Sequence, residues 1–346
     1  LLAKAAKAAN ISLTLDAEEA DRLELSLALF ESLARNHELD GWQGLGLAVQ
    51  AYQKRAFALL DWLAVLAADT RRCLMVRLVK GAYWDTEIKR AQERGLENFP
   101  VFTRKASTDI SYLACARKLL ARRDLFYPQF ATHNAHTAAA VLELAVDTGA
   151  PDQGFEFQRL HGMGEALHEQ LVHSSGVPCR IYAPVGTHEA LLPYLVRRLL
   201  ENGANNSFVN RIADDMAPID EIIADPVSKL ENYRQIPHPR ISLPSALFAG
   251  RQNSLGPDLT DTSVLERLQL DILEAGRQPV LATPLLATTV TSSEEHIICN
   301  PADSRLETGR IIACNTHDLQ NALDSAVIAT KRWHLTPLPE RIACLE

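Results

Sequence analysis

Short apolar runs alternate with long amphipathic stretches over residues 11 to about 210. The runs are ISLTL (11–15), LGLAV (45–49), CLMVRLV (73–79), PQFAT (128–132), FEFQRL (155–160) and CRIYA (179–183). Each run is bounded by turn-forming residues and is rich in branched or aromatic side chains, which is typical of a buried parallel strand. The stretches between the runs have a helical period. Six strand–helix units in succession predict an α/β fold with a parallel sheet.

A parallel sheet can be an open, doubly wound sheet or a closed barrel, and the motifs after the strands help to distinguish them. No G-x-G-x-x-G follows any run, so the usual signal of a doubly wound, dinucleotide-binding sheet is missing. A barrel of eight such units needs about 250 residues. The chain starts at Leu1 and ends at Glu346 inside apparent helices, so we expect an incomplete (β/α)8 barrel without its first two units. Such a piece exposes two strand edges, and by itself we expect it to be marginally stable or to aggregate.

The sequence pattern changes at about residue 211, where prolines become frequent and the hydrophobic periodicity weakens. We predict a connecting segment that winds over a surface, with one short helix near residues 263–276. From about residue 294 the pattern indicates two short strands and a helix capped by Thr316 or Asp318. The predicted domains are a barrel (1–225), a connecting segment (226–290) and the beginning of a second domain (291–346).

Composition narrows the class of protein further. The hydrophobic share of 47% is enough to form a full core. The length of 346 residues is too great for one average domain. A net charge of −8 argues against a nucleic-acid-binding face. The six cysteines form no C-x-x-C pair, so neither a zinc site nor a disulfide framework is predicted, and a reducing cytoplasm fits. No run of 18 apolar residues indicates a membrane span.

Candidate chemistry gathers where the strands end, which in parallel barrels is the side of the active site. Polar, small or aromatic residues end or follow all six runs: Asp16, Gln50, Lys80 with Gly81, Ala82, Tyr83 and Trp84, Thr132 with His133 and Asn134, His161 with Gly162 after Leu160, and Tyr182 near the end of the sixth. Strand ends always meet polar loops, so one or two of these residues need no function. Six consecutive examples favour a functional rim.

Arg77 is unusual because it lies inside an apolar strand, where a guanidinium needs an anionic or polar partner. The small Gly81 and Ala82 then allow a flat ligand to approach the backbone. His133 could stack on such a ligand or hydrogen-bond it, although a lone histidine there is more often structural. His133 and His136 lack the spacing of a helical metal pair, so no metal is predicted.

The stretch LLPYLVRRLLENGAN predicts a helix with one polar face. Tyr194, Arg197, Arg198 and Glu201 share that face because their spacing is i, i+3, i+4, i+7. Two adjacent guanidinium groups suit a planar anion such as a carboxylate. A solvated face with an Arg–Glu pair explains the same spacing equally well.

Five segments make a family resemblance specific: LVKGAYWDTEIKRAQ, YPQFATHNAHT, FEFQRLHGMGE, CRIYAPVGTHE and YLVRRLLENGANNSFVNRI. Together they resemble the proline dehydrogenase domain of the bifunctional proline utilization A family, over residues 11 to about 225. The segment from about residue 294 is similar to the N-terminal edge of an aldehyde dehydrogenase. The resemblance implies a distorted barrel that holds FAD non-covalently. The flavin would take a hydride from L-proline, yield pyrroline-5-carboxylate and pass electrons to membrane quinone.

The resemblance also implies properties of the parent protein. Its aldehyde dehydrogenase part would oxidise glutamate semialdehyde to glutamate with NAD, and no NAD site is expected within these 346 residues. The parent is expected to be a homo-oligomer, located in the cytoplasm or peripherally at the inner membrane face.

Residue roles are carried over by the same resemblance. Arg197 and Arg198 would pair with the proline carboxylate, and the substrate ring would be walled by Tyr182, Tyr194 and Leu160, with Tyr83 nearby. Asp16 would lie beside the substrate and Arg77 beside flavin N5. The flavin would also be bound by Gln50, Lys80, Gly81, Ala82, Thr132, His133 and Asn134. Glu201 would orient the arginine-bearing helix or reach the cofactor.

Two other interpretations stay open from the sequence. The family pattern has an earlier strand with a lysine that contacts the substrate carboxylate, and the present residues do not include it. Lys80 at a strand end also fits the nucleophile of a Schiff-base aldolase. A non-enzymatic barrel fragment that binds flavin weakly or not at all is the third possibility.

Overall fold

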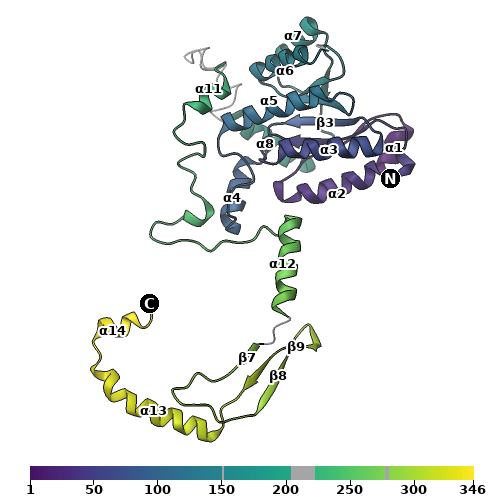
Figure 1. Ribbon diagram of the computed structural model, residues 1–346. Helices are drawn as coiled ribbons and strands as arrows, with labels where there is room; N and C mark the ends of the chain where they lie inside the picture. The colour runs from purple at the N-terminus through teal and green to yellow at the C-terminus, as the bar shows by residue number, and fades with distance from the viewer. Residues whose placement is uncertain (150–151, 204–222, 277–279) are drawn as a thin grey trace. The chain divides into compact units, whose positions relative to one another are not determined.

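Six parallel strands form one curled sheet in the computed structural model, which describes residues 1–149, 152–203, 223–276 and 280–346, without the side chains of 197–203 (Figure 1). The strands are β1 (Leu13–Leu15), β2 (Leu45–Gln50), β3 (Leu74–Val79), β4 (Phe126–Ala131), β5 (Glu156–Leu160) and β6 (Cys179–Tyr182). They are ordered β1 to β6 as in the sequence. The six predicted runs are these six strands, and the predicted α/β barrel fold is confirmed. Among the described residues, β1 pairs with β2 alone and β6 with β5 alone.

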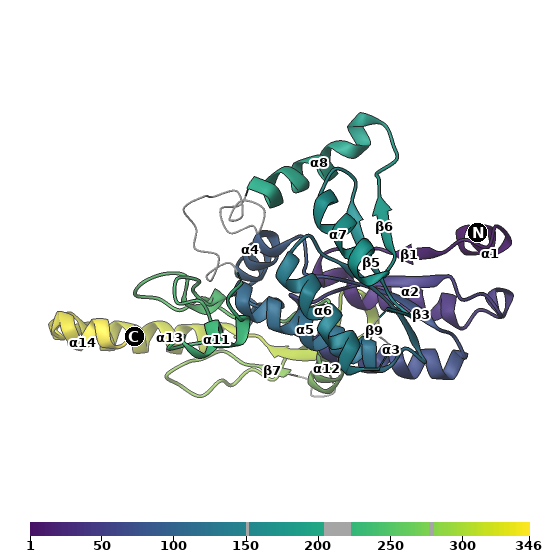
Figure 2. The same cartoon turned by 90° about the horizontal axis from the view of Figure 1, so that it is seen from above.

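Helices follow the strands in the order that the periodicity predicts. They are α1 (Leu2–Ala8), α2 (Leu23–Ala34), α3 (Ala56–Thr70), α4 (Trp84–Arg94), α5 (Lys105–Ala121), α6 (Ala135–Asp147), α7 (Glu165–Ser175) and α8 (His188–Gly203). Figures 1 and 2 show α3, α5 and α6 along one side of the strands. In the described parts of the chain, no helix has the length and apolar character needed to cross a bilayer.

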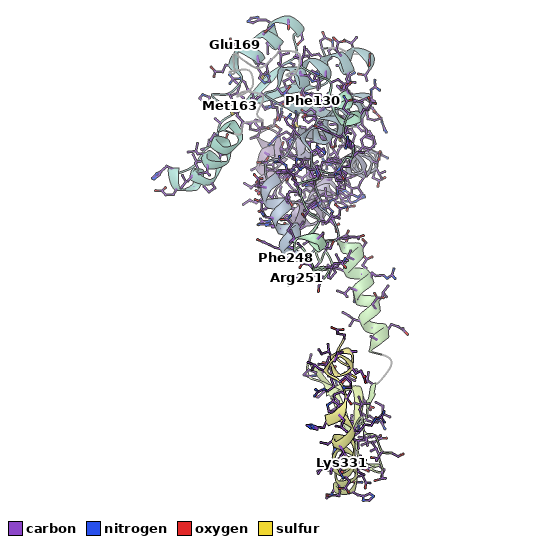
Figure 3. All side chains as sticks on the ribbon, turned by 90° about the vertical axis from the view of Figure 1, so that its left-hand side faces the viewer. Phe130, Met163, Glu169, Phe248, Arg251 and Lys331 are labelled. Atoms are coloured by element: carbon purple, nitrogen blue, oxygen red, sulfur yellow. The ribbon has the colours of Figure 1, made fainter. Side chains whose placement is uncertain are left out.

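The main core lies between the sheet and these helices. On β3, Leu74, Val76 and Leu78 are fully buried, whereas Arg77 lies on the opposite, inner face because side chains alternate along a strand. The next strands add rings to the same core. Phe130, labelled in Figure 3, has its centroid 5.7 Å from that of Phe155 and 6.3 Å from that of Phe157. The helix-facing side of the sheet is therefore apolar, and the inner face is free to carry chemistry.

The proline-rich segment after residue 223 lies on the barrel up to Thr262, where the first compact unit ends. It contains α11 (Pro226–Glu231) and a short 3-10 helix, Pro244–Ala246. Arg104 stacks 3.8 Å from the ring centroid of Tyr233 and donates to the carbonyls of residues 235–237. Further along, Arg251 lies over the ring of Phe248 (Figure 3). The segment thus winds over the barrel surface, held largely by backbone carbonyls.

The second unit comprises residues 263–346. Its elements are most of α12 (Thr262–Ala275), β7 (Val280–Ala282), β8 (Glu295–Asn300), β9 (Asp303–Ile312), α13 (Thr316–Leu335) and α14 (Leu338–Ala343). The sheet order is β7-β9-β8, with β8 and β9 antiparallel. The sequence predicts β8, β9 and the helix that follows, but not β7. The three-part division at residues 225 and 290 stays a prediction.

Both caps predicted for α13 are wrong, by one and by three residues. Asn315, not Thr316 or Asp318, is the N-cap, and its side-chain oxygen accepts from the backbone N–H of Asp318 at 2.8 Å. Asp318 instead accepts hydrogen bonds from the backbone of Thr291 and Ser292, so its carboxylate fixes the preceding loop.

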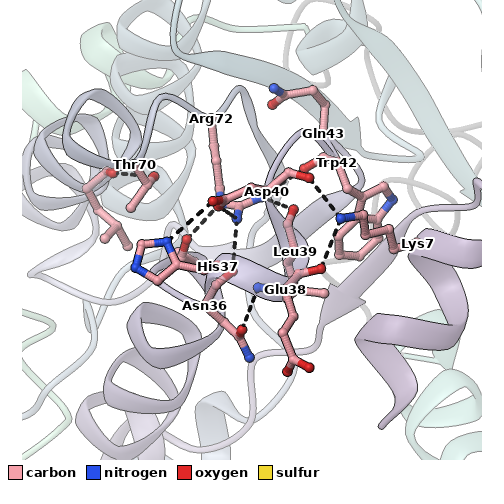
Figure 4. Close-up of polar contacts among 12 residues, drawn as sticks. Lys7, Asn36, His37, Glu38, Leu39, Asp40, Trp42, Gln43, Thr70 and Arg72 are labelled. Carbon is pink, nitrogen blue, oxygen red and sulfur yellow. Dashed lines mark hydrogen bonds and ion pairs between the residues drawn. The ribbon is translucent and has the colours of Figure 1, made fainter.

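Arg72 joins the loop between α2 and β2 to the end of α3 (Figure 4). Its side chain is 3% exposed. The guanidinium donates to the carbonyls of Ala34 (2.7 Å), Leu39 and Trp42 (both 2.9 Å), and to Asp40 (3.2 Å). These acceptors lie at the end of α2 and in the segment that follows it up to Trp42, so a single buried cation satisfies several carbonyls of that segment.

We therefore expect Arg72→Met to lower the free energy of unfolding by about 3 kcal/mol or more, because several buried acceptors lose their donor. Chemical denaturation of the purified protein measures this. The control is Arg122→Met, whose pair with Asp124 is about half exposed and is expected to contribute less than about 1 kcal/mol. Equal effects of the two substitutions would contradict the role assigned to Arg72.

Candidate active site

Arg77 is the centre of the inner rim. It donates from a terminal nitrogen to Asp16 Oδ1 at 2.5 Å, and its guanidinium carbon lies 4.5 Å from the ring centroid of Tyr182. Only 14% of its side chain is exposed. The three residues come from β3, the end of β1 and the end of β6, so the anionic partner expected for Arg77 is supplied from a distant strand. The Nε of Arg77 is buried and has no hydrogen-bond partner in the described structure.

Tyr182 borders this cation, and Tyr83 is held by the loop that also bears Asp16. Burial raises the pKa of Tyr182, and the neighbouring Arg77 opposes that shift. Tyr182 is paired in register with Leu160 at the end of β5. Tyr83 donates to Glu18 Oε2 at 2.8 Å. The loop that follows β1 therefore carries carboxylates to both Arg77 and Tyr83.

Hydrogen bonds fix the position of that loop. The buried side chain of Gln50 donates to the carbonyl of Ala17 at 3.3 Å and accepts from Gln53 at 2.7 Å. Farther along, the buried carboxylate of Glu87 on α4 accepts the backbone N–H of Ala20 at 2.7 Å. Gln50, predicted to bind the flavin, is therefore engaged here in positioning the segment that bears Asp16.

Lys80 points to the helices, where its ammonium lies 2.5 Å from Asp109 Oδ1 and 3.2 Å from Thr137 Oγ1. Burial lowers the pKa of Lys80 and the adjacent Asp109 opposes this. Lys80 and Lys105 together keep the pKa of Asp109 below its ordinary value despite burial. Lys80 thus joins β3 to α5 and α6 and does not share the Arg77 cluster.

Gly81 and Ala82 are both exposed immediately after β3. Gly81 has a φ of 135°, and a Cβ there would lie 2.5 Å from the ring of Tyr52. The backbone at this point rests on an aromatic ring, so no side chain fits beneath it. The exposed side of the same backbone is the side on which a flat ligand could lie.

The segment Thr132–His133–Asn134 is held by its own polar groups. Asn134 caps α6 by accepting from the backbone N–H of Thr137 at 3.0 Å. The Nε2 of His133 accepts from the backbone N–H of Leu160 at 3.0 Å. The carbonyl of Thr132 lies 3.0 Å from Nε2 of the buried His168, which must donate because a carbonyl only accepts. The other ring nitrogen of His168 lies 3.5 Å from the sulfur of Cys179.

The predicted anion-binding helix is α8. Tyr194 is partly buried on it. The side chains of Arg197, Arg198 and Glu201 lie outside the described residues, so their roles stay predictions. Sequence reasoning missed Glu18, Glu156 and His168. Polar residues at alternate positions of FEFQRL and CRIYA were the available signal for a polar inner face.

The strand order and the inner rim define a class of protein: a parallel α/β barrel with a partly unsatisfied buried cation at the carboxyl ends of its strands. A sequence profile described as proline dehydrogenase matches residues 1–211. That is more than half of the chain, and the chain belongs to the proline dehydrogenase family.

Individual relatives agree with this assignment. The chain is 53% identical to the bifunctional protein PutA of Klebsiella aerogenes and 52% identical to that of Escherichia coli, over 97% of this chain and 26% of each relative. It thus spans about a quarter of the length of these relatives. A crystal structure of a Bradyrhizobium japonicum proline utilization A mutant is similar, with 54% identity, a TM-score of 0.75, and 83% of this chain and 28% of that chain covered. The crystal structure of Bdellovibrio bacteriovorus proline utilization A inactivated by N-propargylglycine is 30% identical, with a TM-score of 0.81, and the match covers 95% of this chain and 34% of that chain.

His168 generates a prediction about pH. Burial lowers the pKa of His168, so the folded protein resists protonation of a ring that the unfolded chain protonates near its ordinary pKa of about 6.5. Its contribution to stability is present above about pH 6.5 and declines as the pH falls. We expect the free energy of unfolding to decrease between about pH 7.5 and 5.5, and His168→Gln to reduce that decrease. Denaturation at the two pH values measures it.

His37→Gln is the matched control, because the side chain of His37 is 96% exposed. The control should leave the pH dependence of the wild type intact. An unaltered pH dependence in His168→Gln would show that other groups cause it.

Proposed function

We propose that this chain forms the proline-oxidising barrel of a bifunctional proline utilization protein. In this proposal L-proline would lose a hydride and a proton to become pyrroline-5-carboxylate, with a non-covalent FAD as the hydride acceptor. The observation that carries it is Arg77, held between Asp16 and Tyr182 with its Nε buried and unpaired. Membership of the proline dehydrogenase family and the names of the relatives support the reaction class.

The residues of the rim fit a flavin. Part of the Arg77 side chain is exposed at the rim, and its guanidinium would donate to an acceptor on the ring of a bound cofactor. The exposed backbone at Gly81 and Ala82 leaves room for a planar group, and Tyr182 offers a flat neighbour. The cofactor, when bound, supplies the hydride acceptor, and the protein supplies orientation and charge.

The described side chains then have separable tasks. Arg77 would donate toward the cofactor while Asp16 holds its guanidinium in place. Tyr182 and Leu160, paired across β5 and β6, would wall one side of the substrate ring, with Tyr83 fixed nearby by Glu18. Arg197 and Arg198 of α8 would pair with the substrate carboxylate, since a guanidinium can bind both of its oxygens. Tyr194, on the same helix, would complete the wall.

Other parts of the proposal concern the parent protein. Electrons would leave to membrane quinone, and a second activity would oxidise glutamate semialdehyde with NAD. We assign no NAD site to residues 1–346. Homo-oligomerisation and a cytoplasmic or peripheral membrane location are part of the same proposal.

The test uses the full-length protein that contains this chain. It should purify yellow, release FAD on acid precipitation, and be reduced by L-proline without oxygen. We expect Arg77→Met to slow flavin reduction by about a hundredfold, as loss of a preorganised donor does. Arg122→Met on the surface is the control and should match the wild type. A colourless protein that still oxidises proline, or an unaltered rate in Arg77→Met, would refute the proposal.

The Schiff-base aldolase is disfavoured because the Lys80 side chain is turned toward α5 and α6, where it contacts Asp109 and Thr137, and does not lie in the Arg77 cluster. Borohydride treatment with a carbonyl substrate should leave Lys80 unmodified. A reduced adduct on Lys80 would favour the aldolase instead.

A further inference from the structure

Glu156 is a buried carboxylate with partners on three strands, and the function proposed above leaves it without a task. It begins β5 and is 3% exposed. One oxygen accepts from Gln129 on β4 at 2.9 Å and from Gln158 at 2.7 Å. Arg180 on β6 donates its Nε to that oxygen at 2.8 Å and a terminal nitrogen to the other at 2.9 Å. The pair is therefore bidentate, which is the geometry that fixes orientation best.

The second step is that Arg180 and Tyr182 lie on the same face of β6. They are two residues apart on one strand, and side chains alternate between faces. Tyr182 is the residue whose ring lies against Arg77. The orientation of β6 at Arg180 thus determines where the ring of Tyr182 meets the guanidinium of Arg77.

The third step is that β6 has few other restraints. It is four residues long, and among the described residues it pairs with β5 alone. Half of the Arg180 side chain is exposed, so this strand is not enclosed by apolar packing as β3 is. A charged side-chain bond between β5 and β6 therefore adds a restraint that the short backbone ladder does not supply.

Stability alone is a weak reason for such a pair. Burying a carboxylate is costly, and apolar residues of similar volume often replace a buried ion pair without loss. Orientation is a better reason, because a bidentate pair defines one relative position of two strands.

We propose that Glu156 is a positioning residue for the site at Arg77: through Arg180 it sets the inner face of β6 so that Tyr182 is held against Arg77. This inference rests on the proposed function, since Tyr182 is there assigned to the wall of the proline site. Glu156 itself does not touch the substrate or the cofactor. Gln129 and Gln158 hold the carboxylate toward β6.

The experiment uses the full-length protein and a double-mutant cycle of Glu156→Gln, Arg180→Gln and both together. The wild type and each variant are assayed for flavin content, kcat and KM for L-proline. We expect each single variant to raise KM by about tenfold with full flavin content and a smaller change in kcat, since one charge-assisted pair is lost. The double variant should be no worse than either single variant, because both remove the same interaction. Arg180→Lys, which keeps the charge, should recover part of the loss.

Hydrogen–deuterium exchange at residues 179–182 is the second readout, and it should increase in both single variants. Arg122→Gln, on the exposed pair with Asp124, is the control and should change neither readout. If Glu156→Gln fails to fold, Arg180→Gln carries the test, because its side chain is 47% exposed. An unchanged KM in a folded variant, or additive effects in the double variant, would overturn the positioning role of Glu156. If the wild type still oxidises proline in that case, the proposed function stands. A flavin-loaded wild type that does not oxidise proline overturns the proposed function first.

Discussion

The contact on which the rim depends is the one between the Arg77 guanidinium and the Asp16 carboxylate, 2.5 Å apart. Arg77 sits in a strand whose other face is fully apolar, so its charge can be accommodated only by turning inward. The curl of the sheet brings β1 and β6 to it, although neither is its neighbour. One charge therefore links the inner faces of three strands, and the loop after β1 is ordered around it.

A second buried arginine illustrates a different use of the same group. Arg72 meets mostly backbone carbonyls, which accept its protons wherever the loop places them, and its effect is to organise that loop. Arg77 meets a carboxylate and an aromatic ring and keeps one N–H unsatisfied. Complete satisfaction is typical of a structural residue, whereas an unsatisfied buried donor needs a further explanation, for which the proposed function offers a ligand. This contrast, more than position at a strand end, separates scaffold from site.

The sequence predicted the fold well because each strand is a short apolar run bounded by turn signals, and β1 to β6 all follow that rule. The site was predicted less evenly. Arg77 stood out as a cation in an apolar strand, and Asp16 as the residue after a strand. Lys80 follows a strand as well, but it is three residues after Arg77 and therefore faces the opposite side of the sheet. There its ammonium donates to Asp109 on α5. Only the observed register separates these cases.

Glu156 escaped the sequence analysis for a physical reason. Reading strand ends finds groups that face a ligand, but the residues that orient them lie earlier in the strand on the inner face, as Gln158 and Glu156 lie two and four positions before Leu160. At those positions a glutamate and two glutamines within strands look like ordinary polar alternation, since an edge strand beside water has the same pattern. Their meaning depends on which strands become neighbours. Once β5 lies between β4 and β6, Glu156 accepts from both sides, and a pattern typical of solvent exposure becomes a buried network. The proposed hydride transfer would need that kind of support, because such a reaction depends on holding two flat groups at a fixed distance and angle.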